Sequence, residues 1–162
     1  MADPKLLQKV TLATAAFSII FAVVSTALPN WHAALGESIG LWQLCTSNCV
    51  SYACPAGSCH AARAFAILSV LMSVAAATTM ALKFFKYHDM GLLLKLTSGL
   101  AGGAAFMVLL TVICFVVFLV NLGGFNSSIG FSLACVAMGI DVSTASLAIS
   151  LYKKENAAQP SA

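Results

Sequence analysis

Four long apolar stretches dominate the chain, and shorter polar segments separate them. They cover residues 10–28, 64–82, 96–120 and 129–151. Each has about 19 to 25 residues, enough for a helix rising 1.5 Å per residue to cross a hydrocarbon core of roughly 30 Å. Because backbone groups in lipid must hydrogen-bond to one another, we predict that each stretch is a transmembrane helix.

The polar segments determine the expected organisation. We predict an extracellular loop at residues 29–62, a cytoplasmic loop at 83–95, a second extracellular loop at 121–128 and a frayed tail at 152–162. Short links force neighbouring helices to pack antiparallel in a compact bundle. Residues 1–162 are therefore expected to form a single tetraspan domain, an all-α membrane protein. Although the first stretch follows lysines as a signal peptide does, it is long enough to span a bilayer.

Basic residues indicate the orientation of the chain. Seven of the eight fall on one side of the membrane if both termini are cytoplasmic: Lys5, Lys9, Lys83, Lys86, Lys95, Lys153 and Lys154. The eighth, Arg63, lies at the outer mouth of the second predicted helix. This pattern obeys the positive-inside rule, and we expect a multi-pass protein of the plasma membrane.

Composition supports lipid as the main solvent and argues against several functions. Hydrophobic residues make up 60% of the chain and charged residues 8%, against about 25% charged residues in soluble domains. A formal net charge of +3 does not indicate nucleic-acid binding. No CxxC couple, HExxH motif or paired carboxylates occur, so we expect no enzyme activity, no cofactor and no small-molecule substrate.

Four cysteines lie close together in the first long loop: Cys45, Cys49, Cys54 and Cys59. On an oxidising side of the membrane two disulfides are expected, with three possible connectivities. The alternative is a metal site that also uses His32 or His60, but the loop lacks paired CxxC spacings. Cys114 and Cys135 fall inside predicted helices and are expected to be buried free thiols.

The same loop carries a recognisable motif: Trp31, then Gly40, Leu41 and Trp42, then cysteines, with Arg63 opening the next helix. This pattern resembles the superfamily of claudins, peripheral myelin protein and epithelial membrane proteins. The resemblance implies a disulfide-braced, extracellular antiparallel β-sheet that the two tryptophans anchor near the helix tops.

The resemblance also implies that Cys45 pairs with Cys54 or Cys59 and that the other two cysteines pair together. A short sheet with little core does benefit from a covalent staple. Tryptophan is also favoured at the lipid–water boundary, so both indoles could be interfacial anchors and nothing more.

The resemblance implies a claudin-like structural role through lateral self-association, cell–cell junctions or membrane organisation. The alternative is an accessory subunit of a larger channel, receptor or transporter complex. The expected partners are lipid and other membrane proteins, either copies of this chain or a larger complex. A short second loop and a C-terminus ending Pro160-Ser161-Ala162 differ from claudins and weigh against barrier formation. Glu37 is the lone ionised residue between 29 and 62, which weighs against an ion-selective pore between cells.

Polar and small residues inside the spans point to helix packing. Asp141 lies midway along the fourth stretch, on a face with Ala134, Ala137, Thr144, Ala145 and Ala148. We expect it to point into the bundle, because a charge at this depth costs at least about 2.5–3.5 kcal/mol. Hydroxyls at matching depth belong to Ser18, Ser73 and Thr111. A structural acid is favoured over contact with a partner's basic residue or a proton-linked step.

Three further motifs complete the sequence. Gly99 and Gly103 form a GxxxG pair, for which packing within the bundle is favoured over packing on a partner. Asn126 begins a glycosylation sequon that we expect to be unoccupied, so close to the helix ends. The third motif is an interfacial belt facing lipid headgroups. Its residues are Lys83, Phe84, Phe85, Lys86, Tyr87 and His88.

Overall fold

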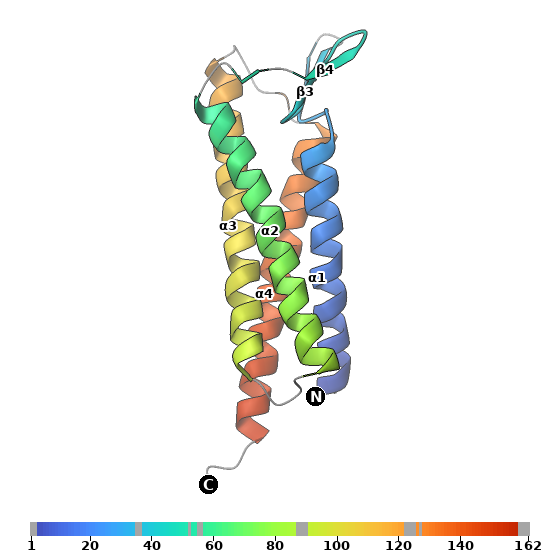
Figure 1. The fold of residues 1–162 in the computed structure, drawn as a ribbon, viewed down its shortest axis with the longest axis vertical. Helices are drawn as coiled ribbons and strands as arrows, with labels where there is room; N and C mark the ends of the chain where they lie inside the picture. Colours follow the sequence, from blue (N-terminus) through green and yellow to red (C-terminus); the bar gives the residue numbers. More distant parts are fainter. Residues whose placement is uncertain are drawn as a thin grey trace.

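A computed structural model shows four long helices side by side, with a small sheet at one end (Figure 1). It describes residues 3–34, 37–51, 53–54, 57–86, 91–121, 126 and 128–158. The helices are α1 (Pro4–Ala27), α2 (Gly57–Phe85), α3 (Gly91–Asn121) and α4 (Ile129–Ala158). Each contains a stretch long and apolar enough to cross a membrane. The prediction of four spans is confirmed, and the chain is a four-span membrane protein.

Local sequence explains where α1 begins and ends. Asp3 is its N-cap and accepts a hydrogen bond from the backbone N–H of Lys5 at 3.0 Å, while Pro4 occupies the first turn, where no donor is lost. Leu28 is extended and Pro29 follows it. The helix therefore stops before the proline, as expected.

The helices extend beyond the apolar stretches. α2 begins at Gly57 rather than residue 64, and α4 continues to Ala158. The tail was predicted to fray from residue 152, but residues 152–158 are helical, so the prediction is wrong for them. Hydropathy identifies the part of a helix that lies in lipid. It does not predict where backbone hydrogen bonding stops, because polar residues also form helices in water.

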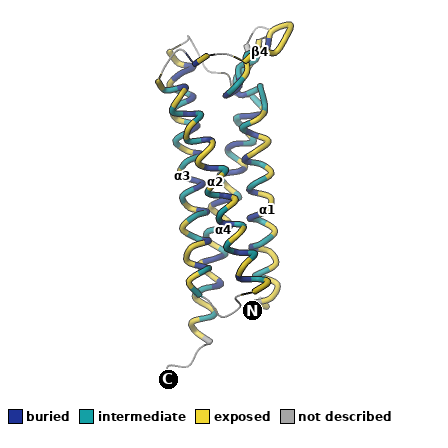
Figure 2. Tube along the Cα trace, in the orientation of Figure 1, coloured by how far each residue is buried: buried dark blue, intermediate teal, exposed yellow. Residues whose placement is uncertain are grey.

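Along each helix, buried positions alternate with exposed ones (Figure 2). Many of the buried residues are small, and many of the exposed residues are large and apolar. In sequence order each helix packs on the next, and α4 closes the bundle against α1. The buried positions include Ala15, Ala22, Ala66, Ala76, Ala101, Ala104, Ala137 and Ala148. Exposed positions include Phe17, Ile20, Leu71, Phe106 and Ile113. This distribution suits a lipid solvent, in which close backbone approach through small residues holds helices together.

The segment between α1 and α2 forms a four-stranded antiparallel sheet in the order β1-β2-β3-β4. Its strands are β1 (His32–Ala34), β2 (Glu37–Ile39), β3 (Gln43–Cys45) and β4 (Cys49–Ser51). Register pairs His32 with Ile39, Ser38 with Cys45, and Leu44 with Val50. The sheet lies at the end of the bundle opposite both termini (Figure 1). The predicted disulfide-braced sheet is thus confirmed.

Candidate functional site

Trp31 joins the sheet to the helices. Its side chain is 1% exposed, and its indole N–H donates to the carbonyl of Ser25 at 2.6 Å. The ring packs edge-on against Phe115, with centroids 5.2 Å apart, and against Phe131 at 6.4 Å. Its backbone N–H donates to the carbonyl of Ile39. Trp31 is therefore a core residue linking α1, β2, α3 and α4, and the alternative that it is only an interfacial anchor is wrong.

Glycine is required on both sides of this junction. A Cβ at Gly40 would lie 2.6 Å from Pro29 Cα and 2.7 Å from the carbonyl oxygen of Leu28. A Cβ at Gly130 would lie 2.6 Å from Trp31 Cδ1. Real Cβ atoms are not found so close to backbone or ring atoms, so only glycine lets these segments meet. Gly40 belongs to the sequence motif. Nothing in the sequence singled out Gly130, which lies in the first turn of α4.

Arg63 fixes the loop that carries Trp42. Its Nε–H donates to the carbonyl of Leu41 at 2.6 Å, and its guanidinium lies 5.2 Å from the centroid of the Trp42 ring. Leu41 is fully buried, and Trp42 packs partly buried against the same core. Hydrogen bonding and cation–π attraction together hold this loop on α2. The motif residues therefore converge on one junction between sheet and bundle.

The two disulfides join Cys45 to Cys49 and Cys54 to Cys59. The pairing implied by the family resemblance, Cys45 with Cys54 or Cys59, is wrong. Cys45 and Cys49 are direct partners in the β3–β4 hairpin, with Cα atoms 4.0 Å apart. The Cα atoms of Cys54 and Cys59 lie 5.7 Å apart, and Cys59 belongs to the first turn of α2. Each bond closes a very short loop, so each restrains its own segment and not the whole chain.

These bonds use the thiols that the metal alternative required. No group of three or more metal-binding side chains occurs among the described residues. His60 is exposed, and His32 is engaged with Asn126. The remaining cysteines, Cys114 and Cys135, are free and only half-buried. The prediction of free thiols is therefore confirmed, but the prediction of burial is wrong for both, since Cys114 packs only partly buried against the Trp31 core and Cys135 is half-buried.

Asp141 lies inside the bundle, 1% exposed, as its small-residue face predicts. The hydroxyl of Ser18 donates to its carboxyl Oδ1, and the Ser73 hydroxyl lies 3.4 Å from the same oxygen. Thr111, the third proposed partner, instead donates to the carbonyl of Met107 at 2.9 Å. The acid thus joins α4 to α1 and α2 through hydroxyls, the arrangement expected of a structural acid in a membrane protein.

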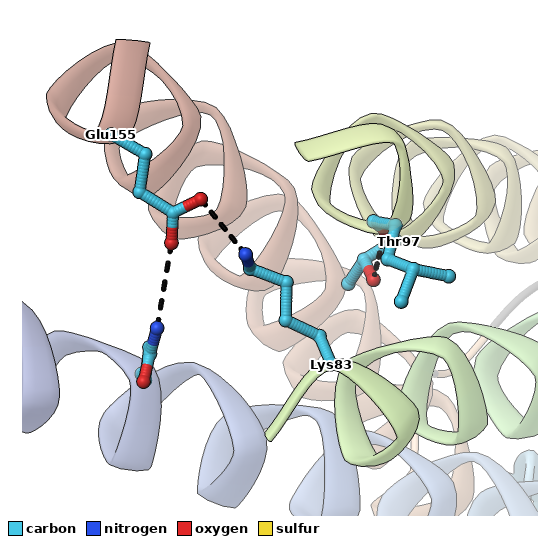
Figure 3. A network of polar contacts seen from close by, with 5 residues as sticks. Lys83, Thr97 and Glu155 are labelled. Atoms are coloured by element: carbon cyan, nitrogen blue, oxygen red, sulfur yellow. Dashed lines mark hydrogen bonds and ion pairs between the residues drawn. The ribbon is translucent and has the colours of Figure 1, made fainter. Parts of the chain in front are cut away.

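Lys83 is a second buried polar group, at the end of the bundle that carries the termini. Its side chain is 0% exposed, and its ammonium lies 2.8 Å from Glu155 Oε2, whose side chain is 28% exposed. Gln8 donates to the other carboxylate oxygen at 3.4 Å. Figure 3 shows Lys83 of α2 and Glu155 of α4 facing each other. Near them the hydroxyls of Thr79 and Thr97 join α2 to α3 at 2.8 Å.

The belt of aromatic and basic residues is therefore only partly present. Lys83 points into the bundle, so its prediction as part of this belt is wrong. Phe85, 73% exposed, stacks edge-on against Phe84 with centroids 5.0 Å apart, and Lys86 is exposed. Tyr87 and His88 lie outside the described residues.

The two glycines of the GxxxG motif face different surroundings. A Cβ at Gly103 would overlap the end of the Met72 side chain on α2, so this glycine packs inside the bundle. A Cβ at Gly99 would meet nothing within 4 Å. The prediction of packing within the bundle therefore fails for Gly99, because this position of α3 faces outward.

Asn126 is exposed beside the sheet. Its backbone N–H donates to His32 Nδ1 at 3.0 Å, which ties the second connection to β1. Ser127, the middle residue of the sequon, lies outside the described residues. The occupancy of this site stays a prediction.

The outward face of α4 differs from those of the other helices. Five small residues and Val136 recur along it at alternating intervals of four and three, and we name this set the α4 serine stripe. The stripe consists of Ser132, Val136, Gly139, Ser143, Ser146 and Ser150, all exposed. Each serine donates to the carbonyl four residues earlier, at 2.8–3.3 Å. The small side chains of the stripe therefore present no unsatisfied serine hydroxyl to lipid. Sequence reasoning missed it because the direction α4 faces was not known.

No family model matches this chain, and no curated protein matches it in sequence.

Proposed function

We propose that the protein is a claudin-like, non-enzymatic structural protein of the plasma membrane that acts by lateral self-association of its helices, with both termini cytoplasmic. The observation that carries the proposal is the α4 serine stripe. In lipid, helices associate through small residues that let backbones approach closely. The outward faces of α1, α2 and α3 present large side chains such as Phe17, Leu71 and Phe106.

The junction around Trp31 adds support. Its tryptophan, the Gly40–Trp42 turn and Arg63 occupy one compact site beneath an antiparallel sheet. This is where the claudin resemblance would place them. We call the four-stranded sheet and the loops that hold it on the helices the cap. A cap fixed in this way suits a role in contacts between proteins or cells.

The same stripe could instead receive a helix of a larger complex, as an accessory subunit would require. Two observations favour self-association. Asp141 is buried and hydrogen-bonded to Ser18 and Ser73 within its own bundle, so its carboxyl group does not reach the outward surface. Lys83 is likewise bonded to Glu155. Contact with a partner would then depend on packing, which a second copy of the same stripe supplies.

The test replaces a glycine of the stripe with a bulky residue. In Gly139→Leu the new side chain projects outward, because a Cβ there meets nothing within 4 Å. We expect the variant to fold normally and to lose energy transfer between donor- and acceptor-labelled copies in phosphatidylcholine vesicles. The physical reason is that leucine separates two helix backbones that glycine lets touch.

Gly102→Leu on α3 is the matched control. It is also exposed, helical and without neighbours within 4 Å, and both substitutions gain the same helix propensity. Energy transfer should survive in this control. If Gly139→Leu leaves energy transfer unchanged, self-association through α4 is wrong. The accessory role replaces self-association under a different outcome. In that outcome the unaltered chain shows no energy transfer but co-purifies with another membrane protein, and Gly139→Leu abolishes the co-purification.

A further inference from the structure

An apolar groove opens between α1 and α2 near the sheet. The two helices are close together near the termini and diverge toward the sheet end (Figure 1). The groove has a volume of about 270 Å³. Its lining residues are Val23, Thr26, Trp42, Ala66, Ile67, Val70 and Leu71.

The lining indicates what kind of molecule the groove can hold. The hydroxyl of Thr26 donates to the carbonyl of Val23 at 2.9 Å, so it is already satisfied. Val23, Ile67 and Leu71 are exposed on the membrane side of the bundle, which places the open side of the groove against lipid. An occupant must therefore be hydrocarbon, because a polar ligand would leave its hydrogen-bonding groups unpaired there.

The size of the groove narrows the choice. Pockets that enclose a whole drug-sized ligand have volumes of roughly 300–1,000 Å³, and this groove is smaller. The groove can therefore hold only part of a lipid molecule, such as one flexible acyl chain. A chain lying along α1 and α2 also parallels the direction of lipid chains in a bilayer.

The upper end of the groove adds a charge. Trp42 forms the roof, and the guanidinium of Arg63 lies 5.2 Å from the centre of its ring. Tryptophan and arginine both favour the boundary between hydrocarbon and headgroups. A phosphate at this depth carries the charge complementary to Arg63.

We propose that this groove binds one acyl chain of a phospholipid from the leaflet next to the sheet, with the headgroup phosphate beside Trp42 and Arg63. The bound chain fills the space between α1 and α2 and supports the Trp42 loop from below. The site lies between α1 and α2, away from the α4 serine stripe, and does not depend on self-association.

Photolabelling of the full-length protein tests the proposal. The probe is phosphatidylcholine with a diazirine in one acyl chain, added to phosphatidylcholine vesicles that contain the protein. We expect most of the label on peptides from the groove segments of α1 and α2. The amount of label on the outward face of α3 should be much lower. Uniform labelling around the bundle would show that ordinary annular lipid covers the groove and would overturn the proposal.

Val70→Trp fills the groove from α2, where Val70 is half-buried. Its matched control is Val74→Trp, one turn along the same helix, exposed and outside the lining. We expect the excess labelling to disappear in Val70→Trp and to persist in Val74→Trp. Val23→Phe fills the groove from α1 and replaces Val70→Trp if that variant does not fold. Unchanged labelling in a folded filling variant refutes the site.

Two further probes separate the parts of the ligand. A diacylglycerol with the same photoreactive chain lacks the phosphate, and we expect it to label the groove more weakly than the phosphatidylcholine probe. Equal labelling would refute the contribution of Arg63. A photoreactive sterol should label no groove residue selectively. Selective sterol labelling that competes with phosphatidylcholine would overturn the assignment to an acyl chain.

Discussion

At the scale of single residues, buried polar groups stabilise the bundle from two depths. Asp141 lies near the middle and contacts two serine hydroxyls, whereas Lys83 lies near the termini and contacts a carboxylate. A buried charge is tolerated only when paired, because removal of one partner leaves the other desolvated. The two groups also link different helices: Asp141 joins α4 to α1 and α2, and Lys83 joins α2 to α4.

Lys83→Met should destabilise the protein by about 1–3 kcal/mol. This is less than the roughly 3–5 kcal/mol seen for fully buried pairs, because Glu155 is 28% exposed and keeps some hydration. The measurement is the free energy of unfolding in mixed micelles titrated with sodium dodecyl sulfate.

Lys86→Met, at an exposed position three residues further along the chain, is the control and should change that free energy little. Equal loss in both variants would mean that the Lys83–Glu155 pair has no special role.

At the scale of elements, the sheet is held by local rather than long-range links. Cys45–Cys49 closes the β3–β4 hairpin, and Cys54–Cys59 closes the approach to α2. Trp31 and Arg63 connect the sheet and its loop to the helices, and Cys54–Cys59 ties the segment after β4 to the first turn of α2. Strands of three residues have little core of their own, so their stability depends on these side-chain contacts.

Loss of Cys45–Cys49 in the double variant Cys45→Ser/Cys49→Ser should leave the helices and the Trp31 contact unchanged. The hairpin tip is exposed and its loop is short, so little unfolded-state entropy is at stake. Hydrogen exchange should accelerate in β3 and β4 alone.

Cys54→Ser/Cys59→Ser is the comparison. Cys59 is fully buried and packs in the Trp31 core, so this variant should also increase exchange at the start of α2. Exchange that increases throughout the bundle in the first variant would contradict a local role for Cys45–Cys49.

At the scale of the whole molecule, both termini lie at the end of the bundle opposite the sheet (Figure 1). Seven of the eight basic residues belong to that end by sequence. The positive-inside rule therefore predicts that this end lies in the cytoplasm and that the disulfides lie outside.

Epitope tags at the two termini should become accessible to antibody together, and only after the plasma membrane is permeabilised. A tag in the loop between β3 and β4, after Ser47, should be detected on intact cells. Detection of either terminal tag on intact cells would reverse the orientation. Because antibody access depends on topology alone, the result does not depend on what the protein binds.

The antiparallel sheet in the first loop was implied only by the resemblance to claudins. The pattern of apolar residues was sufficient to predict the four spans, the long loop between the first two and the inward direction of Asp141. These features depend on hydropathy and on periodicity along one segment. Asp141 was predictable because its own helix carries a face of small residues. Depth in the membrane gave Ser18, Ser73 and Thr111 as candidate partners, and only the two serines contact it.

Only the tertiary structure decided how positions on different elements meet. It paired Cys45 with Cys49, brought Lys83 to Glu155, required glycine at position 130 and turned Gly99 outward while Gly103 packs on α2. Hydropathy identifies which segments of the chain cross the membrane. It does not determine how each helix is rotated about its own axis, or which residues of two strands lie opposite each other. Those two quantities arise when side chains from separate segments pack together, and a single segment's sequence does not determine them.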